Sequence, residues 1–178
     1  MLEYPRKVLL AMDGTGDSDR AARVAVALSS KSGAELHVVH VGRLAETSSG
    51  AAVGHPSYLP GEPPGYAERQ ARKLLERQVE ELRASGGTVT EAHLRMGRPA
   101  PEVIALAAIL GVDLVVVGSG GPHAMRRAIA TATHRAALGS VSDPIVRTAP
   151  CPVLVVRGYE MSRDAAPSER LADTKEGG

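Results

Sequence analysis

Two short glycine- and serine-rich segments in the last third of the chain have the composition of a phosphate-binding site, here called the phosphate cradle. Gly-Ser-Gly-Gly at 118–121 directly follows an apolar run, and Gly-Ser-Val-Ser occupies 139–142. Glycines let backbone N–H groups approach a ligand without a Cβ in the way, and serines that open a helix add hydroxyls to its free N–H donors. We therefore expect this region to bind an anion, phosphate above all.

A second glycine-containing turn, Ala-Met-Asp-Gly-Thr-Gly at 11–16, follows the first apolar run. In an open parallel α/β sheet, ligands bind at the carboxyl ends of strands where the strand order reverses. Adjacent strands would bring this turn and 118–121 to one crevice, with Asp13 placed to accept hydrogen bonds from a ribose or an adenine amino group. Asp13 and Asp17 also have a purely structural interpretation as helix caps, and spacing alone leaves both open.

Short β-branched runs alternate with longer segments of helical periodicity along the chain. This order predicts an α/β protein with an open five-stranded parallel sheet and helices on both faces, of the flavodoxin-like or Rossmann-like type. Strands are expected at 7–12, 36–41, 88–94, 112–117 and 152–157, and helices at 17–31, 66–85 and 101–110. Residues 1–157 would form one domain, with a long loop at 43–65 and a disordered polar tail at 158–178.

The composition limits the classes of partner. The formal net charge is +1 with both signs interspersed, Phe and Trp are absent, and only four Tyr are present. A basic stripe, stacking platforms for nucleic-acid bases and membrane-length apolar runs are all missing, so we expect no nucleic-acid and no membrane partner. The N-terminus lacks the apolar run of a signal peptide and Cys151 is the single cysteine, which together favour the cytoplasm.

Other nucleotide-binding signatures fit the chain poorly. No Gly-Lys dipeptide occurs, which excludes a Walker A loop. A dinucleotide fingerprint would need glycine where Asp19 stands and an acidic residue where the second strand ends in Val-Gly-Arg, so NAD is not the expected ligand. The run Asp-Gly-Thr-Gly-Asp-Ser at 13–18 partly matches the Ser-Gly-Gly-x-Asp-Ser loop of ATP pyrophosphatases, which leaves an ATP-consuming enzyme as an alternative.

No set of side chains indicates catalysis, and none has the spacing of a metal site. The six histidines are scattered, and neither a cysteine pair nor a carboxylate-histidine motif accompanies them. We expect His37 to lie in a strand and His40 to be a packing residue beside the crevice. Cys151 lies between two prolines and is expected to be structural rather than nucleophilic.

Several segments of the chain resemble the universal stress proteins. The resemblance rests on Lys-Val-Leu-Leu-Ala-Met-Asp-Gly at 7–14, His-Val at 40–41, Met-Gly-Arg-Pro at 96–99 and, most specifically, the segment 139–157; it covers roughly 6–157. It implies the strand order 3-2-1-4-5 and a stress-response regulator that binds ATP, with Mg²⁺ where needed, or AMP or another adenine nucleotide, with at most slow hydrolysis. It also implies an unknown protein partner and a homodimer through the last strand, Val153, Leu154, Val155 and Val156.

The same resemblance implies which residues contact the nucleotide. Ala11, Met12 and Val41 would line the base. Asp13 would hold the adenine or ribose end, and Gly97 would let the loop after the third strand pass close to the ligand. The phosphates would lie on Gly118, Gly121, Gly139, Ser140, Val141 and Ser142. Each of these residues can also be interpreted without a ligand: Val41, for example, as a core residue and Ser142 as a helix N-cap.

The chain departs from the ATP-binding pattern of that family in one place. The pattern has Gly, two residues, Gly, nine residues and then Gly-Ser or Gly-Thr, whereas seventeen residues separate Gly121 from Gly139. The excess of eight is about two helical turns. If the segment 125–138 loops outward, Gly139 and Ser140 return to the phosphates and its basic residues either add charge there or form a solvated face. If it folds inward, it fills the crevice and the chain is an interaction module that binds no nucleotide.

Overall fold

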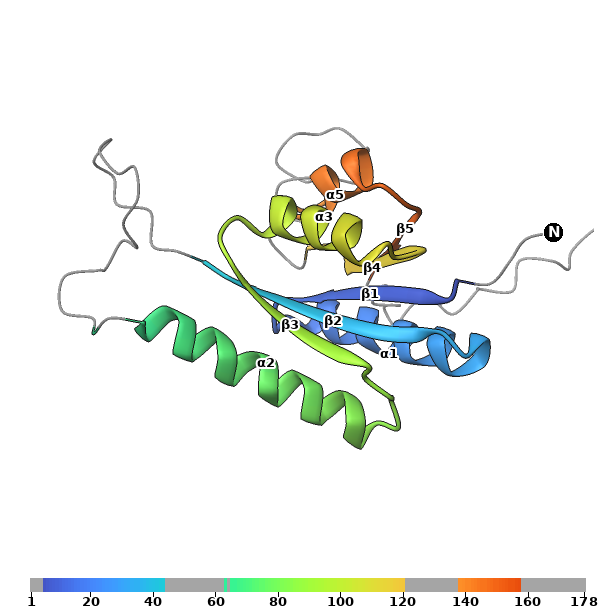
Figure 1. Cartoon of the computed structure of the whole chain (residues 1–178), viewed down its shortest axis with the longest axis horizontal. Coiled ribbons are helices and arrows are strands. Elements are labelled where there is room, and N and C mark those ends of the chain that lie inside the picture. Colours follow the sequence, from blue (N-terminus) through green and yellow to red (C-terminus); the bar gives the residue numbers. More distant parts are fainter. Residues whose placement is uncertain (1–4, 44–62, 64, 121–137, 158–178) are drawn as a thin grey trace, which may run out of the picture.

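A parallel sheet of five strands, in the order β3-β2-β1-β4-β5, forms the centre of the structure (Figure 1). The computed structural model describes residues 5–43, 63, 65–120 and 138–157 of the 178 in the chain. The strands are β1 (Lys7–Met12), β2 (Glu35–Gly42), β3 (Glu91–Met96), β4 (Leu114–Gly118) and β5 (Val153–Val156). The helices are α1 (Gly16–Ser32), α2 (Tyr66–Ala84), α3 (Pro99–Leu110) and α5 (Ser142–Thr148). These elements confirm the predicted fold class and strand order.

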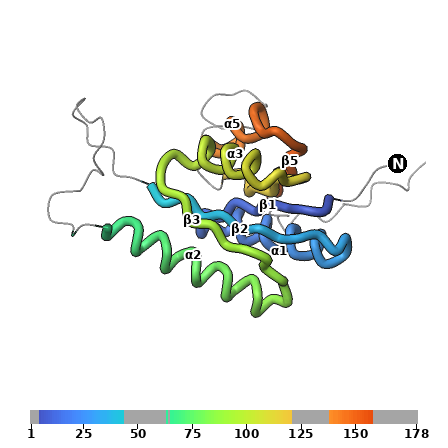
Figure 2. Tube along the Cα trace, viewed as in Figure 1, coloured from blue at the N-terminus to red at the C-terminus, as the bar shows by residue number. Residues whose placement is uncertain are grey.

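Helices cover both faces of the sheet (Figure 1). On one face, α1 and α2 pack on a core that contains Val8, Leu10 and Val38. On the other face, α3 and α5 pack on a core that contains Leu9 and Val115. Since successive side chains of a strand point to opposite faces, the apolar run of β1 serves both cores. Figure 2 shows α2 running alongside β2 and β3, the outer part of the sheet.

The start of α1 is fixed by polar contacts at the carboxyl end of β1. Asp13 Oδ1 accepts hydrogen bonds from the backbone N–H and the hydroxyl of Thr15, at 2.9 and 2.7 Å. Thr15, rather than either aspartate, is the N-cap and accepts from the N–H of Ser18. The end of β4 lies directly against this turn, because a Cβ on Gly118 would be 2.9 Å from the Asp17 carbonyl. Glycine at 118 therefore permits the contact between β4 and α1.

Two predicted strand starts differ from the structure by more than one residue. Val112 was assigned to the fourth strand, but it closes α3: its N–H donates to Ala107 O at 3.2 Å after Gly111 turns left-handed at φ 58. This Schellman motif explains why Val112 is apolar although it lies outside the strand: its side chain is buried beside the end of α3. The third strand was predicted at 88–94, whereas β3 begins at Glu91, opposite His37 of β2.

Several predicted features fall outside the described residues. They are most of the loop at 43–65, most of the segment 125–138 and the tail at 158–178. Within the described ranges, none of the helices combines the length and the apolar character that crossing a bilayer requires.

Candidate functional site

A cavity of about 770 Å³ opens at the carboxyl ends of β1, β2 and β4. This is the end of a parallel sheet at which α/β proteins bind ligands, and it is the place that the sequence predicts. Most of the residues predicted to contact a nucleotide line this cavity: Ala11, Met12, Asp13, Val41, Gly118, Ser140, Val141 and Ser142. The structure therefore gathers residues that are up to 131 positions apart in the sequence, from Ala11 to Ser142, around one space.

Two of the predicted contacts that the structure describes do not line the cavity. Gly97 has φ 145 and faces the first turn of α3, where a Cβ would be 3.2 Å from Glu102 Oε1. Gly139 lies behind the lining, packed against Gly120. Gly121 lies outside the described residues.

The two glycine- and serine-rich segments lie in contact with each other despite the long sequence between them. The N–H of Gly139 donates to Ser119 O at 2.9 Å, and a Cβ on Gly139 would be 2.8 Å from the Cα of Gly120. The buried hydroxyl of Ser142 donates long hydrogen bonds of 3.4 Å to the carbonyls of Ser119 and Gly139. Gly120 and Ser140 consequently lie on one continuous part of the cavity wall. Residues 121–137, on which the choice between an inward and an outward insertion depends, lie outside the described part of the chain.

The carboxylate of Asp17 joins two walls of the cavity. Its Oδ2 accepts a hydrogen bond of 2.8 Å from the hydroxyl of Ser119, and its Oδ1 accepts one of 2.9 Å from the guanidinium of Arg20. The first contact ties the first turn of α1 to the loop after β4. The second is a partly exposed ion pair that offsets the negative charge of Asp17.

His40 lines the cavity while its ring is 7% exposed. Its Nδ1 lies 3.0 Å from the carbonyl oxygen of Met12, which only accepts, so Nδ1 carries a proton. In the neutral ring Nε2 is then an acceptor. His40 was expected to be a packing residue. It is buried, and it also forms part of the wall of the candidate site.

One whole wall of the cavity comes from α2 and was missed by the sequence analysis: Tyr66, Ala67, Gln70, Ala71 and Leu74. The end of β2 approaches α2 closely, because a Cβ on Gly42 would be 2.7 Å from the Cβ of Ala71. The glycine directly after the predicted strand at 36–41 is the one signal of this approach in the sequence. The lining also includes Thr15, Asp17, Ser18, Val39, Gly42, Arg43, Pro99, Val103, Val117 and Gly120.

Cys151 has the properties of a structural thiol. It packs half-buried against the core between α3, α5 and the sheet. Burial raises the pKa of the Cys151 thiol, and a hydrogen bond with the backbone of Val115 opposes that effect only in part. A raised pKa keeps the sulfur protonated at neutral pH, which makes it a poor nucleophile, in line with the sequence analysis.

The parallel order of the strands, the helices on both faces and the glycine-lined cavity at the strand ends define a flavodoxin-like α/β protein with a cavity at its switch point. The chain belongs to the Universal stress protein family, whose profile matches residues 5–157. The resemblance noted in the sequence is thereby confirmed.

Individual relatives cover nearly the same span. The chain is 34% identical over 154 residues to Universal stress protein YxiE of Bacillus subtilis, across 85% of this chain and 98% of that one. Its fold is similar to that of a universal stress protein in complex with cAMP, with a TM-score of 0.59, 22% identity, and coverage of 86% and 98%. It is also similar to a universal stress protein from Archaeoglobus fulgidus in complex with dAMP, with a TM-score of 0.56, 21% identity, and coverage of 87% and 99%.

Proposed function

We propose that this protein is a stress-response regulator that binds an adenine nucleotide, ATP above all, in the cavity at the carboxyl ends of β1, β2 and β4. The observation that carries the proposal is the contact of Gly139 with Ser119 and Gly120, which joins the two halves of the phosphate cradle. The proposal is also supported by the two universal stress proteins of the same fold that bind cAMP and dAMP, both of them adenine nucleotides.

The cavity has an apolar part and a polar part, as a nucleotide requires. Ala11, Val39 and Val41 would contact the faces of the adenine ring. Asp13 already accepts from Thr15 through Oδ1, which leaves Oδ2 for a ribose hydroxyl or the adenine amino group. The volume of about 770 Å³ lies in the range of roughly 300–1,000 Å³ that small-molecule sites occupy.

The phosphates would lie against Gly118, Gly120 and Ser140, where backbone N–H groups and a hydroxyl are the donors. Mg²⁺ would enter with ATP, held mainly by phosphate oxygens and water. The cytoplasm, where a lone thiol such as that of Cys151 stays reduced, is the compartment that fits this function.

The ATP-pyrophosphatase alternative is less well supported. It would need the loop at 13–18 to offer its hydroxyls to a phosphate, but the hydroxyl of Ser18 is 3% exposed and donates to the carbonyl of Thr15 at 2.8 Å. The carboxylate of Asp13 is engaged by Thr15 in the same turn. This loop is therefore organised to start α1.

Calorimetric titration of the purified full chain with Mg-ATP tests the proposal, after heat-denatured protein has been checked for nucleotide carried through purification. We expect one site with a dissociation constant on the order of micromolar, about −8 kcal/mol. No binding heat together with an empty extract would contradict it and favour the interaction module that binds no nucleotide. Rapid turnover with a second substrate would favour the enzyme.

We further propose that the protein forms a homodimer through β5. This strand pairs with β4 alone among the described strands, so one of its edges has unpaired N–H and C=O groups. Leu154 at its centre is 36% exposed. In a two-fold symmetric pair each copy brings its own Leu154 to the same interface.

Replacing Leu154 with Glu is expected to convert the dimer to a monomer, because two like charges would meet across the symmetry axis. Light scattering coupled to size exclusion measures the mass directly. Val146→Glu is the matched control, since Val146 is 44% exposed on α5 and lies outside β5. A wild-type chain that elutes as a monomer, or a Leu154→Glu variant that stays dimeric, would rule out this interface.

A further inference from the structure

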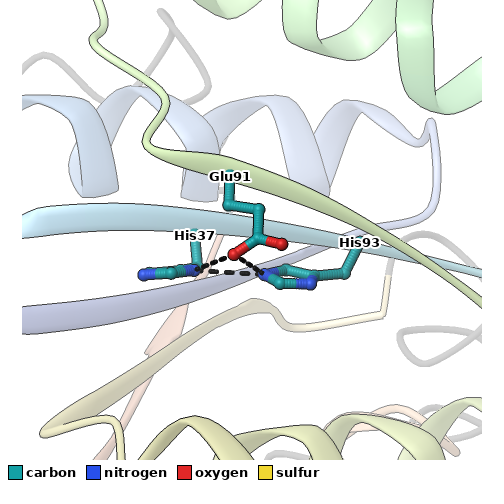
Figure 3. A group of neighbouring side chains, drawn as sticks. All are labelled: His37, Glu91 and His93. Carbon is teal, nitrogen blue, oxygen red and sulfur yellow. Dashed lines mark hydrogen bonds and ion pairs between the residues drawn. The ribbon is translucent and has the colours of Figure 1, made fainter.

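A second group of chemically active side chains lies on β2 and β3, outside the cavity lining. His37 on β2 and Glu91 and His93 on β3 point to the face that α3 covers (Figure 3). The strand register pairs His37 with Glu91 and Val39 with His93. All three therefore share one face of neighbouring strands. None of them lines the candidate nucleotide cavity, although Val39, which is two residues from His37 on β2 and pairs with His93, does.

The three side chains place their ligand atoms in a small triangle. His37 Nδ1 is 3.1 Å from His93 Nε2, and Glu91 Oε2 is 3.9 Å from the first nitrogen and 3.8 Å from the second. Zinc binds such atoms at about 2.0–2.2 Å in a tetrahedron, which sets them roughly 3.3 Å apart. Shifts of about half an ångström would let one ion contact all three, and the exposed carboxylate of Glu91 is free to make the larger movement.

The imidazoles are held in place, as ligands of a metal must be. The side chains of His37 and His93 are 6% and 13% exposed, whereas that of Glu91 is 60% exposed. The other nitrogen of His37, Nε2, lies 3.5 Å from Glu35 Oε2. A carboxylate on the far nitrogen of a metal-binding histidine fixes its orientation and raises its basicity. One buried and one partly buried ring, with a carboxylate behind the first, form a prepared ligand set.

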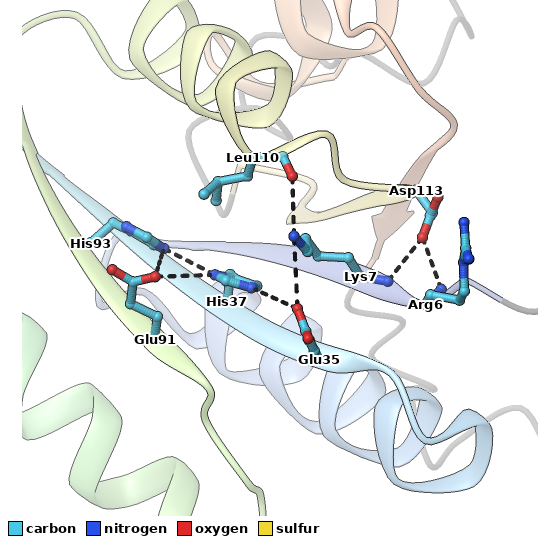
Figure 4. A network of polar contacts seen from close by, with 8 residues as sticks. All are labelled: Arg6, Lys7, Glu35, His37, Glu91, His93, Leu110 and Asp113. Carbon is cyan, nitrogen blue, oxygen red and sulfur yellow. Dashed lines mark hydrogen bonds and ion pairs between the residues drawn. The ribbon is translucent and has the colours of Figure 1, made fainter.

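The carboxylate of Glu35 is itself positioned by its neighbours (Figure 4). Lys7 Nζ lies 3.7 Å from Glu35 Oε2 and donates a hydrogen bond of 3.2 Å to the carbonyl of Leu110. The network thus runs from α3 through β1 and β2 to β3. Burial lowers the pKa of His93, with Glu91 opposing the shift and His37 and Arg95 adding to it.

We propose that His37, Glu91 and His93 form a zinc site with three protein ligands and an open position for water. Two imidazoles and one carboxylate are the ligands that suit Zn²⁺, and Co²⁺, Ni²⁺ and Cu²⁺ would compete for the same atoms. The ion would join β2 to β3, the edge strand that pairs on one side only among the described strands. Its effect is therefore to stabilise the sheet edge.

A direct hydrogen bond between two neutral imidazoles would account for the 3.1 Å contact without a metal, and a zinc titration separates the two cases. Metal-free full-length protein is titrated with Zn²⁺ in competition with a chromophoric indicator. We expect one equivalent to bind. Glu91→Gln and His93→Gln should each weaken binding by at least about tenfold, since each removes a ligand.

Matched controls are Glu80→Gln, at an exposed carboxylate on α2, and His55→Gln, outside the described residues; both should bind zinc like the wild type. Saturating zinc should raise the melting temperature of the wild type by on the order of 5–10 °C at about one hundred times the dissociation constant, and that of Glu91→Gln much less. Co²⁺ should give the intense visible bands of tetrahedral coordination.

Absence of zinc binding would overturn the proposal and leave a hydrogen-bonded histidine pair. Binding that survives both Glu91→Gln and His93→Gln would overturn it too, because the ion would then lie on other histidines. Glu91 is exposed, so its glutamine variant is expected to fold, and circular dichroism checks that it does.

Discussion

Replacing Gly139 with Ala is expected to weaken ATP binding by about tenfold or more. The new Cβ would lie 2.8 Å from the Cα of Gly120 and 3.1 Å from the carbonyl oxygen of Ser119, and backbone atoms cannot rotate out of the way. Overpacking of this kind costs about 1–3 kcal/mol, and about 1.4 kcal/mol corresponds to a factor of ten in affinity. The two segments would have to separate, so a phosphate held by Gly120 and Ser140 together would lose part of its contacts. Calorimetry with Mg-ATP measures the change.

Gly16→Ala is the control for this substitution. A Cβ on Gly16 would meet nothing within 4 Å, although its neighbours Thr15 and Asp17 both line the cavity. We expect this variant to bind ATP like the wild type. If Gly139→Ala lowered the free energy of unfolding and yet bound ATP normally, Gly139 would have a role in packing alone. The proposed position of the phosphates would then be wrong.

Replacing Ile145 with Ala is expected to lower the free energy of unfolding by about 2–5 kcal/mol. The side chain is fully buried in the core formed by the sheet and α3, next to residues such as Leu9 and Val103. Helix α5 has seven residues, too few for a stable helix in isolation, so its position depends on this contact. Chemical denaturation followed by circular dichroism gives the free energy and, through its slope, the exposed surface.

The adjacent residue provides the comparison. Val146 is 44% exposed, and Val146→Ala should change the free energy of unfolding by less than about 0.5 kcal/mol. Equal effects of the two substitutions would mean that α5 is not docked on the core. Because Ser142 opens the same helix, Ile145→Ala should also weaken ATP binding under conditions in which the variant is still folded.

Local sequence patterns were sufficient to find the five strands and three of the four described helices, whereas the bounds of α5 were not predicted. Strand β1 was predicted with its observed bounds, because an apolar run between charged and glycine residues leaves little choice of where it begins and ends. The start of β4 was misplaced, since Val112 is as apolar as the strand that follows although it belongs to the end of α3. The strand order itself came from the resemblance to a family rather than from the pattern.

The two sites differ in how far the sequence could reveal them. Glycines and serines after strands are local signals, and they led to one wall of the cavity. The wall formed by α2 depends on how far that helix reaches along β2, which no local pattern encodes. The three proposed zinc ligands were not recognised as a group, and no metal site was expected, because ligand spacing was sought along the chain. Glu91 and His93 are two residues apart on β3 and therefore share one face. His37 lies beside them only because of the register between β2 and β3.

Strand β1 has a neighbour on each side, and the ribosome makes these two neighbours at very different times. β2 follows closely, whereas about 100 residues separate the end of β1 at Met12 from the start of β4 at Leu114. At translation rates of about 5–20 residues per second, that interval takes roughly 5–20 s. During that interval, the edge of β1 that later pairs with β4 is unpaired and apolar. Exposed strand edges of this kind promote aggregation. We expect ribosome-bound chains that end before β4 to aggregate more readily than the full chain, in which β4 covers this edge of β1.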